Sequence, residues 1–477
     1  MSSKPAPANV TAAGGSLRWF VPLMGLFLGL SVLKFGNAAI MAQHVGWPQD
    51  GLQWVLVQWP VVLGYGVLAV VAAAGLAVAS WRVRGRGHWL AALPAAWLGW
   101  QLMAAGMTVD AGLTGATLKH FVACAVCFYL GFFALGPTRS LGSFWLGMTA
   151  ALALALGTGL EQHFGGLART REELLKHEAA HWRDMPPEEI TELERGGMIT
   201  RTPDGYAVPP GLLKKAESTR IYGTLFYPNS FAGALLLLSP PCLVALGTTR
   251  RLTSGARAFV VAVAGGGVLA CLFWSGSKSG WLLALVLAVV ALLRLPWNRK
   301  LKVAVVGGLL VLGLIGFGVK YASFFRHGAT SVVARFDYWQ AALRTAMKKP
   351  LFGTGPGTFM RPYERIKKPE AEMTRLTHND YLQQASDSGW LAFGLYAVFI
   401  GGVLVLSGRH SIRAEGWEPF AAWLGTLAWA LQSMVEFNLY IPALAWTALT
   451  LMGWLLRQAL ENDSTRPVPA ANLRPRA

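Results

Sequence analysis

The chain has 477 residues, of which 54% are hydrophobic and only 14% are charged. Its apolar residues occur in runs of roughly 17 to 25, the length with which a helix crosses a bilayer, which excludes a water-soluble globule. The net charge is +18, but Lys and Arg form short strips between the apolar runs. We therefore expect the basic residues to face a membrane surface and not nucleic acid.

The apolar runs predict an all-α, polytopic membrane protein of about twelve transmembrane helices. In chain order the predicted spans are 19–33, 54–79, 89–106, 118–135, 144–160, 231–246, 258–274, 281–293, 303–319, 390–406, 420–435 and 441–456. No small-residue cleavage site follows the polar N-terminus, so we expect the first run to be an uncleaved span. The cysteines Cys124, Cys127, Cys242 and Cys271 fall in or at the end of apolar runs and are expected to be small buried hydrophobes.

Basic residues predict the orientation of these spans. They follow the even-numbered spans: Arg82, Arg84 and Arg86; Arg139; Arg250, Arg251 and Arg257; Arg294, Arg299, Lys300 and Lys302; Arg409 and Arg413. The positive-inside rule then places both termini in the cytoplasm. The chain divides into spans one to five (1–160), a first outer loop (161–227), spans six to nine (228–319), a second outer loop (320–389), spans ten to twelve (390–457) and a cytoplasmic tail (458–477).

The two outer loops have predicted structure of their own. In the first, we expect a charged helix over 170–184, a second helix from Pro186-Pro187 to Gly196-Gly197, and a hairpin over 198–208. In the second, an amphipathic helix is predicted from apolar residues at helical spacing: Val332, Phe336, Trp339, Leu343 and Ala346. Such a helix lies in the lipid–water interface on the outer side of the membrane, or it forms a lid on the bundle.

A polar segment, Thr-His-Asn-Asp-Tyr-Leu-Gln-Gln at 377–384, precedes the tenth span. Thr377 and Asp380 have the spacing of a helix N-cap and its third residue, which predicts His378 in the first helical turn. Unpaired N–H groups and the positive end of the dipole attract anions there and favour a neutral imidazole. His378 is therefore a candidate general base; the alternative is a surface histidine on an interfacial helix.

Three cations share the outer side with this histidine. They are Arg220 before the sixth span, Lys278 in a tight turn between two spans, and Arg335 in the second loop. Lys278 has no Asp or Glu in its turn, and a lone lysine near membrane depth needs an anionic partner. A neutral histidine could deprotonate a hydroxyl group, and that hydroxyl could then displace a phosphate leaving group whose charge these cations stabilise. Alternatively, Arg220 and Lys278 anchor lipid headgroups.

Five short motifs follow one another along the second half of the chain. They are Arg-Ile-Tyr-Gly-Thr at 220–224 followed by Pro228-Asn229, Ser-Lys-Ser-Gly-Trp at 277–281, Arg-Phe-Asp-Tyr-Trp at 335–339, Pro-Leu-Phe-Gly-Thr-Gly-Pro-Gly at 350–357 and His-Asn-Asp-Tyr-Leu at 378–382. In this order they resemble the O-antigen ligase and O-antigen polymerase superfamily. The resemblance covers about 220–456. It implies a metal-independent, inverting glycosyltransferase without a cofactor, in the bacterial inner membrane, with its active site facing the periplasm.

The same resemblance implies the substrates and the roles of the residues. The donor would be a glycan on undecaprenyl pyrophosphate, and the acceptor a lipid A core or a growing glycan. His378 would activate the acceptor hydroxyl, Arg220 would bind the pyrophosphate together with Lys278 and Arg335, and Tyr222 and Asn379 would support the site. Lys278 stands where the family has arginine, which keeps the charge but loses a bidentate contact.

Two other classes of protein stay open from sequence. A twelve-span lipid or solute transporter needs neither the histidine nor two one-sided loops, and the chain shows no internal repeat. A membrane zinc protease would use His177 and His181, because His-Glu-Ala-Ala-His matches the H-E-x-x-H zinc motif. The glycine run at 353–357 follows no predicted strand, so we interpret it as a turn and not as a nucleotide loop.

Overall fold

The computed structural model describes residues 11–83, 87–195, 197–209, 213, 216–369 and 371–464. Across these residues the regular secondary structure is helical apart from one short hairpin, which confirms the all-α prediction. Arg84, Arg86, Gly196 and residues 465–477 of the predicted tail lie outside the described residues. Among the described residues, seven continuous helical stretches are long and apolar enough to cross a membrane: Val61–Val78, Ala111–Leu135, Phe144–Ala179, Pro228–Thr248, Ser254–Trp274, Arg299–Arg326 and Asp380–Arg413.

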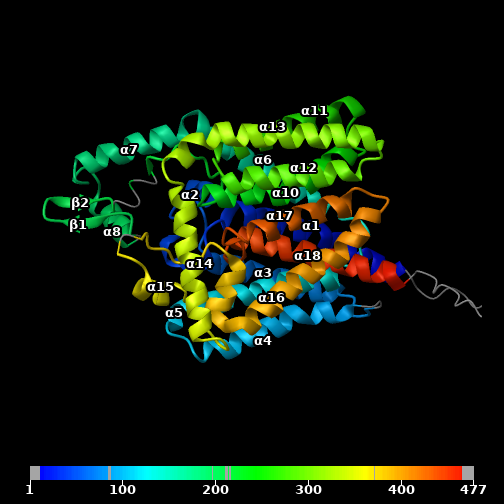
Figure 1. Ribbon diagram of the computed structural model, residues 1–477, viewed down its shortest axis with the longest axis horizontal. Helices are drawn as coiled ribbons and strands as arrows, with labels where there is room; N and C mark the ends of the chain where they lie inside the picture. The colour runs from blue at the N-terminus through cyan, green and yellow to red at the C-terminus, as the bar shows by residue number, and fades with distance from the viewer. Residues whose placement is uncertain are drawn as a thin grey trace, which may run out of the picture.

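The long helices run side by side as a bundle (Figure 1). They are α1 (Thr11–Lys34), α3 (Val61–Val78), α4 (Leu93–Ala105), α5 (Ala111–Tyr129), α6 (Phe144–Glu161), α10 (Pro228–Thr248), α11 (Ser254–Trp274), α12 (Lys278–Arg294), α13 (Arg299–Arg326), α16 (Asp380–Arg413), α17 (Glu418–Gln432) and α18 (Pro442–Ser464). Apart from the run 54–79, each predicted apolar run falls on one of these helices together with short segments that adjoin it. How many of the helices cross the membrane stays a prediction.

One predicted run is broken. The run 54–79 is divided into α2 (Gly51–Leu56) and α3, with Pro60 between them, and the backbone N–H of Trp59 donates to the carbonyl of Lys34 instead of to its own helix. A proline has no N–H and disfavours helix in the preceding residue, which explains the break. The predicted run 89–106 similarly begins with a short 3-10 helix, His88–Ala92.

Close helix packing depends on small residues at crossing points. A Cβ atom added to Gly25 of α1 would lie 2.2 Å from the carbonyl oxygen of Phe144 in α6, and one added to Gly147 would lie 2.6 Å from the backbone of Gly25. Small residues at such positions let two backbones approach, as is common between membrane helices. At the centre of the bundle, α18 buries Trp446 and Trp454 completely.

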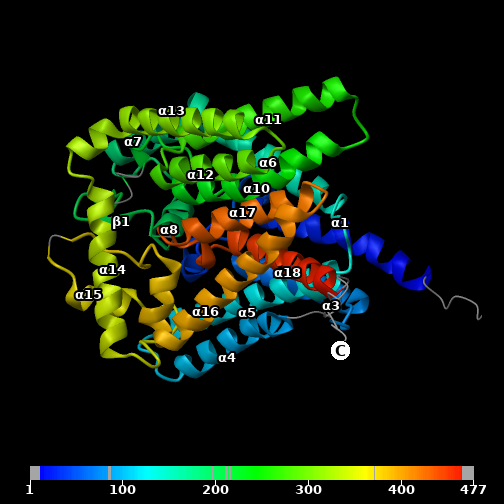
Figure 2. The same ribbon diagram turned by 45° about the vertical axis from the view of Figure 1, so that its right-hand side comes forward.

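The two predicted loops lie at one end of the bundle, and the start of α1 and the end of α18 lie at the opposite end (Figures 1 and 2). The first loop holds α7 (Leu167–Ala179), α8 (Pro187–Arg195) and the predicted hairpin, formed by β1 (Thr200–Thr202) and β2 (Gly205–Ala207). The second loop holds α14 (Thr330–Lys348) and α15 (Met360–Ile366). The predicted helix 170–184 is too long, because α7 ends at Ala179.

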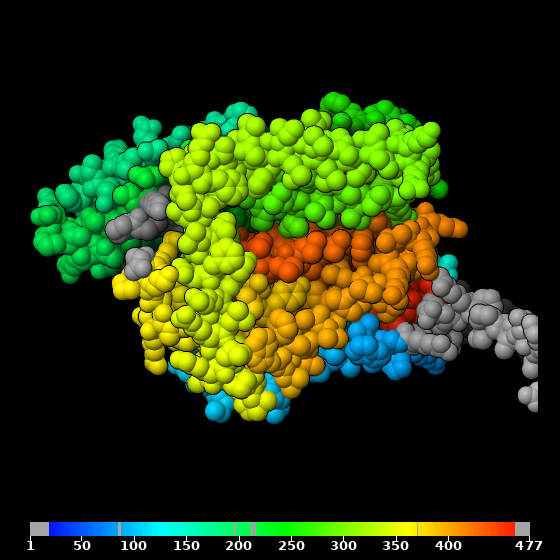
Figure 3. Space-filling model, in the orientation of Figure 1, coloured from blue at the N-terminus to red at the C-terminus, as the bar shows by residue number. Residues whose placement is uncertain are grey.

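The helix α14 crosses the end of the bundle nearly at right angles to the long helices and is uncovered on one face of the molecule (Figures 1 and 3). Its inner face packs against α15 and α16 and buries Tyr338, Ala342 and Ala346. Val332, Phe336 and Leu343 are exposed, so the helix has the packed side of a lid and also an exposed apolar side. Ala346 lies on the buried side and not with the exposed apolar residues.

Gly389, the last residue of the second predicted loop, forms a kink inside α16 (Asp380–Arg413). Gly389 has φ +82° inside α16, and a Cβ atom there would lie 2.0 Å from the carbonyl oxygen of Leu351. Only glycine fits this position without strain. The glycine run 353–357 forms the predicted turn, which packs against the first half of α16: the backbone N–H of Gly357 donates to the Asp387 carboxylate at 2.8 Å.

Candidate active site

A cavity of about 680 Å³ opens where the two loops meet the end of the bundle. Of the residues predicted for the site, Arg220, Tyr222, Arg335 and His378 line this cavity. They come from the segment before α10, from α14 and from the segment before α16, which are more than 150 positions apart at their extremes. The structure therefore brings most of the predicted set into one place.

His378 lies outside the helix that the sequence predicts for it. The N-cap of α16 is Asn379, whose side chain accepts from the backbone N–H of Leu382 at 3.0 Å, and the helix begins at Asp380. The Thr377 hydroxyl instead donates to the carbonyl of Asn379 at 2.7 Å. The predicted Thr377 cap is wrong because Asn379, two residues later, is a stronger N-cap residue and begins the helix. His378 has φ +51°, a left-handed conformation that is costly for a residue with a Cβ atom.

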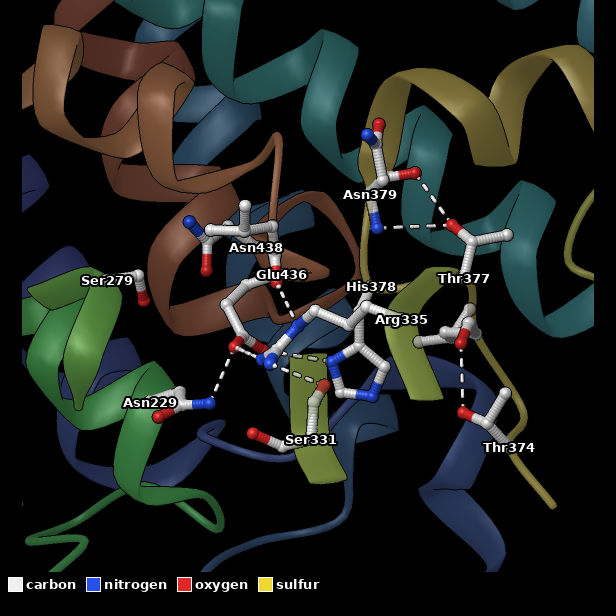
Figure 4. A network of polar contacts seen from close by, with 12 residues as sticks. Asn229, Ser279, Ser331, Arg335, Thr374, Thr377, His378, Asn379, Glu436 and Asn438 are labelled. Carbon is white, nitrogen blue, oxygen red and sulfur yellow. Dashed lines mark hydrogen bonds and ion pairs between the residues drawn. The ribbon is translucent and has the colours of Figure 1, made fainter. Parts of the chain in front are cut away.

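Glu436, between α17 and α18, joins the site residues together (Figure 4). One carboxylate oxygen accepts from Arg335 and from the Asn229 amide, the latter at 2.6 Å. The other oxygen lies 3.1 Å from Nδ1 of His378. Sequence reasoning missed Glu436, although it is a lone acid between two apolar runs, the same signal that singled out Lys278.

The charge state of Glu436 follows from its neighbours. The side chain is 2% exposed, and burial alone would raise its pKa. The charge of Arg335 and the hydrogen bond from His378 outweigh burial and hold the pKa of Glu436 below its ordinary value. Glu436 is therefore a carboxylate at neutral pH. Removing Arg335 or His378 would leave this buried charge without a partner, at a cost of about 3–5 kcal/mol.

The carboxylate fixes the tautomer of His378. An ionised carboxylate only accepts hydrogen bonds, so the proton of the neutral imidazole lies on Nδ1. The ring is further held by Phe437 and Tyr338, whose centroids lie 4.8 and 5.9 Å away. Nε2 then carries a free lone pair and can accept a proton from a hydroxyl group.

Arg220 is held by the turn that contains Lys278. Its Nε donates to the Ser275 carbonyl at 2.7 Å, and Nη2 donates to Oδ1 of Asn229 at 2.7 Å. Gly276, at φ +61°, lies against the guanidinium, and a Cβ atom there would be 3.1 Å from Nε of Arg220. Burial lowers the pKa of Arg220 from its ordinary value, which the Glu436 charge opposes. The guanidinium stays protonated, with N–H groups left for an anion.

Lys278 lies next to the cavity but is outside its described lining. Its ammonium nitrogen is 3.7 Å from the centroid of the Phe324 ring, a cation–π contact. Burial, together with the charges of Arg220 and Arg335, lowers the pKa of Lys278 to about 8. The three cations are thus close enough to repel one another, and an anion among them would relieve that repulsion.

The remaining predicted residues have different positions. Tyr222 lines the cavity, and its backbone N–H is held by the Gln162 side chain at 2.9 Å. Asn379 serves as the helix cap, with its side chain pointing away from Glu436 (Figure 4). Arg335 is anchored by three acceptors: Glu436, the carbonyl of Val435 at 3.0 Å and the carbonyl of Ser331 at 3.2 Å.

The H-E-x-x-H segment lacks the helical geometry that zinc binding through this motif requires. The helix α7 ends at Ala179, and His181 has a left-handed backbone with φ +49°. His177 is paired with Asp184 at 2.8 Å and stacks on Trp182. The two imidazoles therefore do not lie on one face of one helix.

The fold and the site define a multi-pass membrane protein with a histidine–carboxylate pair and fixed guanidinium groups in one cavity at the end of the bundle. Residues 259–397 match the family model described as O-Antigen ligase. This match confirms the resemblance of the chain to the O-antigen ligase and polymerase superfamily, whose members are bacterial membrane enzymes. Lys278, Arg335 and His378 fall inside the matched residues, whereas Arg220 and Glu436 lie outside them. No curated protein matches the chain.

Proposed function

We propose that the protein is a glycosyltransferase that moves a glycan from undecaprenyl pyrophosphate to an acceptor hydroxyl on the periplasmic side of the bacterial inner membrane. One observation carries the proposal: His378 and Arg220 line the same cavity and are connected through Asn229 and Glu436. A base and a fixed cation at one cavity are the two groups that displacement of a diphosphate requires.

His378 acts as the general base in this proposal. Nε2 takes the proton of the acceptor hydroxyl while that oxygen attacks the anomeric carbon of the donor sugar. The bond between this carbon and the pyrophosphate oxygen breaks, and its electron pair leaves with the diphosphate. Attack from the side opposite the leaving group inverts the anomeric centre. Glu436 accepts from Nδ1 and stabilises the imidazolium that forms, as a carboxylate does for a catalytic histidine.

The leaving diphosphate is stabilised by Arg220, with Lys278 as a nearby point charge. Arg220 offers N–H groups beyond those bound to Ser275 and Asn229, and its rigid fork suits two phosphate oxygens. These protein cations support a metal-independent reaction. Arg335, with its three protein acceptors, contributes mainly by holding Glu436 in place.

The predicted topology fits this chemistry. About twelve crossings with both termini in the cytoplasm place the cavity, α14 and the first loop on the periplasmic side, where a carrier-linked glycan is presented. Membrane lipids surround the bundle, and the acceptor is a lipid A core or a growing glycan.

Deletion of the gene in its native host tests the proposal. We expect long glycan to be lost from the cell surface while carrier-linked material accumulates, and we expect wild-type protein to restore it. Finished polymer on the carrier would define a ligase, and single repeat units would define a polymerase. Unchanged surface glycan and an unchanged carrier pool would contradict the proposal and favour a transporter.

A further inference from the structure

A second cavity, of about 510 Å³, lies at the other end of α14. We call it the basic cavity; its charged lining residues are Asp110, Arg344, Lys348, Lys349, Arg361, Glu364 and Arg365. Five of these are cations and two are carboxylates. The cavity therefore carries a positive charge that its own residues do not neutralise.

The pairing of these charges leaves most of the cations available. Both carboxylates contact Arg361: Asp110 lies 2.8 Å from its Nη2, and Glu364 lies 4.0 Å from its Nη1. Within the described part of the chain, Arg344 and Lys348 form no ion pair, and they are exposed one helical turn apart on α14. Thr354, which is 4% exposed, adds a buried hydroxyl to the lining.

The three sides of α14 indicate what reaches the basic cavity. One side packs on the bundle, a second exposes Phe336 (60%) and Met347 (72%), and a third carries Arg344 and Lys348. An interfacial helix turns its apolar side to lipid and its charged side to water. With the Phe336 and Met347 side of α14 turned to lipid, Arg344 and Lys348 would face water, which favours a water-borne anionic group over a lipid headgroup as the ligand of the basic cavity.

The same helix connects the basic cavity to the active site. Arg335 and Tyr338 line the cavity of His378, and Arg344 and Lys348 line the basic cavity. At about 1.5 Å per residue, these positions are roughly 9 to 20 Å apart along the helix axis. An oligosaccharide can span this distance.

We propose that the basic cavity binds phosphate or carboxylate groups on the acceptor glycan and so positions the acceptor hydroxyl at His378. This proposal depends on the proposed glycosyltransferase function. It assigns to the enzyme an anionic saccharide as acceptor, bound by Arg344, Lys348 and Arg365 in a site distinct from the diphosphate site.

Binding to the purified full-length protein tests this without catalysis. The probes are a phosphorylated, delipidated core oligosaccharide, the same oligosaccharide after chemical dephosphorylation, an oligogalacturonate, and vesicles containing phosphatidylglycerol. We expect the phosphorylated oligosaccharide to bind at least tenfold more tightly than its dephosphorylated form and to weaken with added salt. Preference for the oligogalacturonate would assign carboxylate as the recognised group.

The double variant Arg344→Gln with Lys348→Gln should lower this affinity by about 10- to 100-fold, since each residue donates to a charged group. Arg326→Gln is the matched control, because Arg326 is an exposed cation at the end of α13 outside both cavities. Equal binding of charged and uncharged oligosaccharide by wild type, equal affinity in wild type and double variant, or a preference for vesicles would overturn the proposal.

Steady-state kinetics separate this proposal from the proposed function. In the double variant, KM for the acceptor should rise by about 10- to 100-fold, while kcat and KM for the donor stay within about twofold. An active double variant with an unchanged acceptor KM would contradict the proposed acceptor site and would leave the proposed glycosyltransferase function unaffected. Wild type that transfers no glycan would contradict the function itself, whatever the binding experiment shows.

Discussion

The two cavities along α14 differ in how their cations are held. In the active-site cavity, Arg335 donates to the buried Glu436 carboxylate, which His378 also contacts. Arg220 donates to Asn229, which in turn donates to Glu436. In the basic cavity, Arg344 and Lys348 are exposed. Preorganised charge stabilises a transition state without rearrangement, whereas exposed, flexible charge recognises a ligand. The first cavity therefore suits chemistry, and the second suits binding.

The largest effect should come from His378→Ala. Loss of a general base lowers kcat by about 100- to 10,000-fold, with a smaller effect on KM for either substrate. Transfer by purified enzyme, measured at equal protein amounts, checks this. His327→Ala is the control, because His327 follows α13 and lies outside both cavities. A His378→Ala enzyme with wild-type kcat would remove the distinction between the two cavities.

Arg220→Gln should have the next largest effect. The substitution removes the charge that faces the diphosphate, so we expect kcat/KM for the donor to fall by about 10- to 100-fold. Arg220→Lys should recover only part of this, since lysine lacks the two-pronged contact. Binding of inorganic pyrophosphate by calorimetry gives an independent measurement. A donor kcat/KM unchanged in Arg220→Gln would mean that the diphosphate binds elsewhere.

Glu436→Gln should lower kcat by about tenfold to thirtyfold, because an amide does not stabilise the imidazolium as a carboxylate does. We also expect a destabilised protein, since Arg335 loses its ionic partner. Thermal unfolding separates the two effects. Glu172→Gln on α7, an exposed residue of the first loop, is the control. If Glu436→Gln lowers only stability, the carboxylate has a structural role alone.

The smallest effect should be a pH dependence of pyrophosphate binding. Because the pKa of Lys278 is lowered to about 8, Lys278 is charged below this pH and loses its charge as the pH rises through it. A bound diphosphate favours the charged form, so affinity should fall a few-fold between pH 7 and pH 9. Lys278→Arg should flatten this profile relative to wild type, since guanidinium stays protonated. Identical profiles would place Lys278 outside the diphosphate site.

Much of the fold follows from local sequence. Apolar runs of spanning length predict the long helices, because a backbone in lipid satisfies its polar groups within a helix. The turn of the glycine run 353–357 is also predicted, and its glycines adopt the positive φ that a tight turn requires. The kink at Gly389 is not predicted, because a single glycine in a polar segment does not show whether a helix continues through it. The sequence also predicts that Arg220, Lys278, Arg335 and His378 lie on one side of the membrane.

Only the tertiary structure decided how those residues meet. Glu436 joins Asn229, Arg335 and His378 across more than 200 positions of sequence, and spacing along a chain carries no information on such contacts. Nor does the sequence show that the Lys278 side chain lies on the Phe324 ring and outside the cavity lining. Only the packing of α14 shows which of its sides is buried. The sequence by itself determined which long helices form, because these depend on local apolar runs, and it predicts from the basic residues which charges lie on the outer side. Packing between distant helices determined which charges are paired, and this pairing decides which cavity suits catalysis.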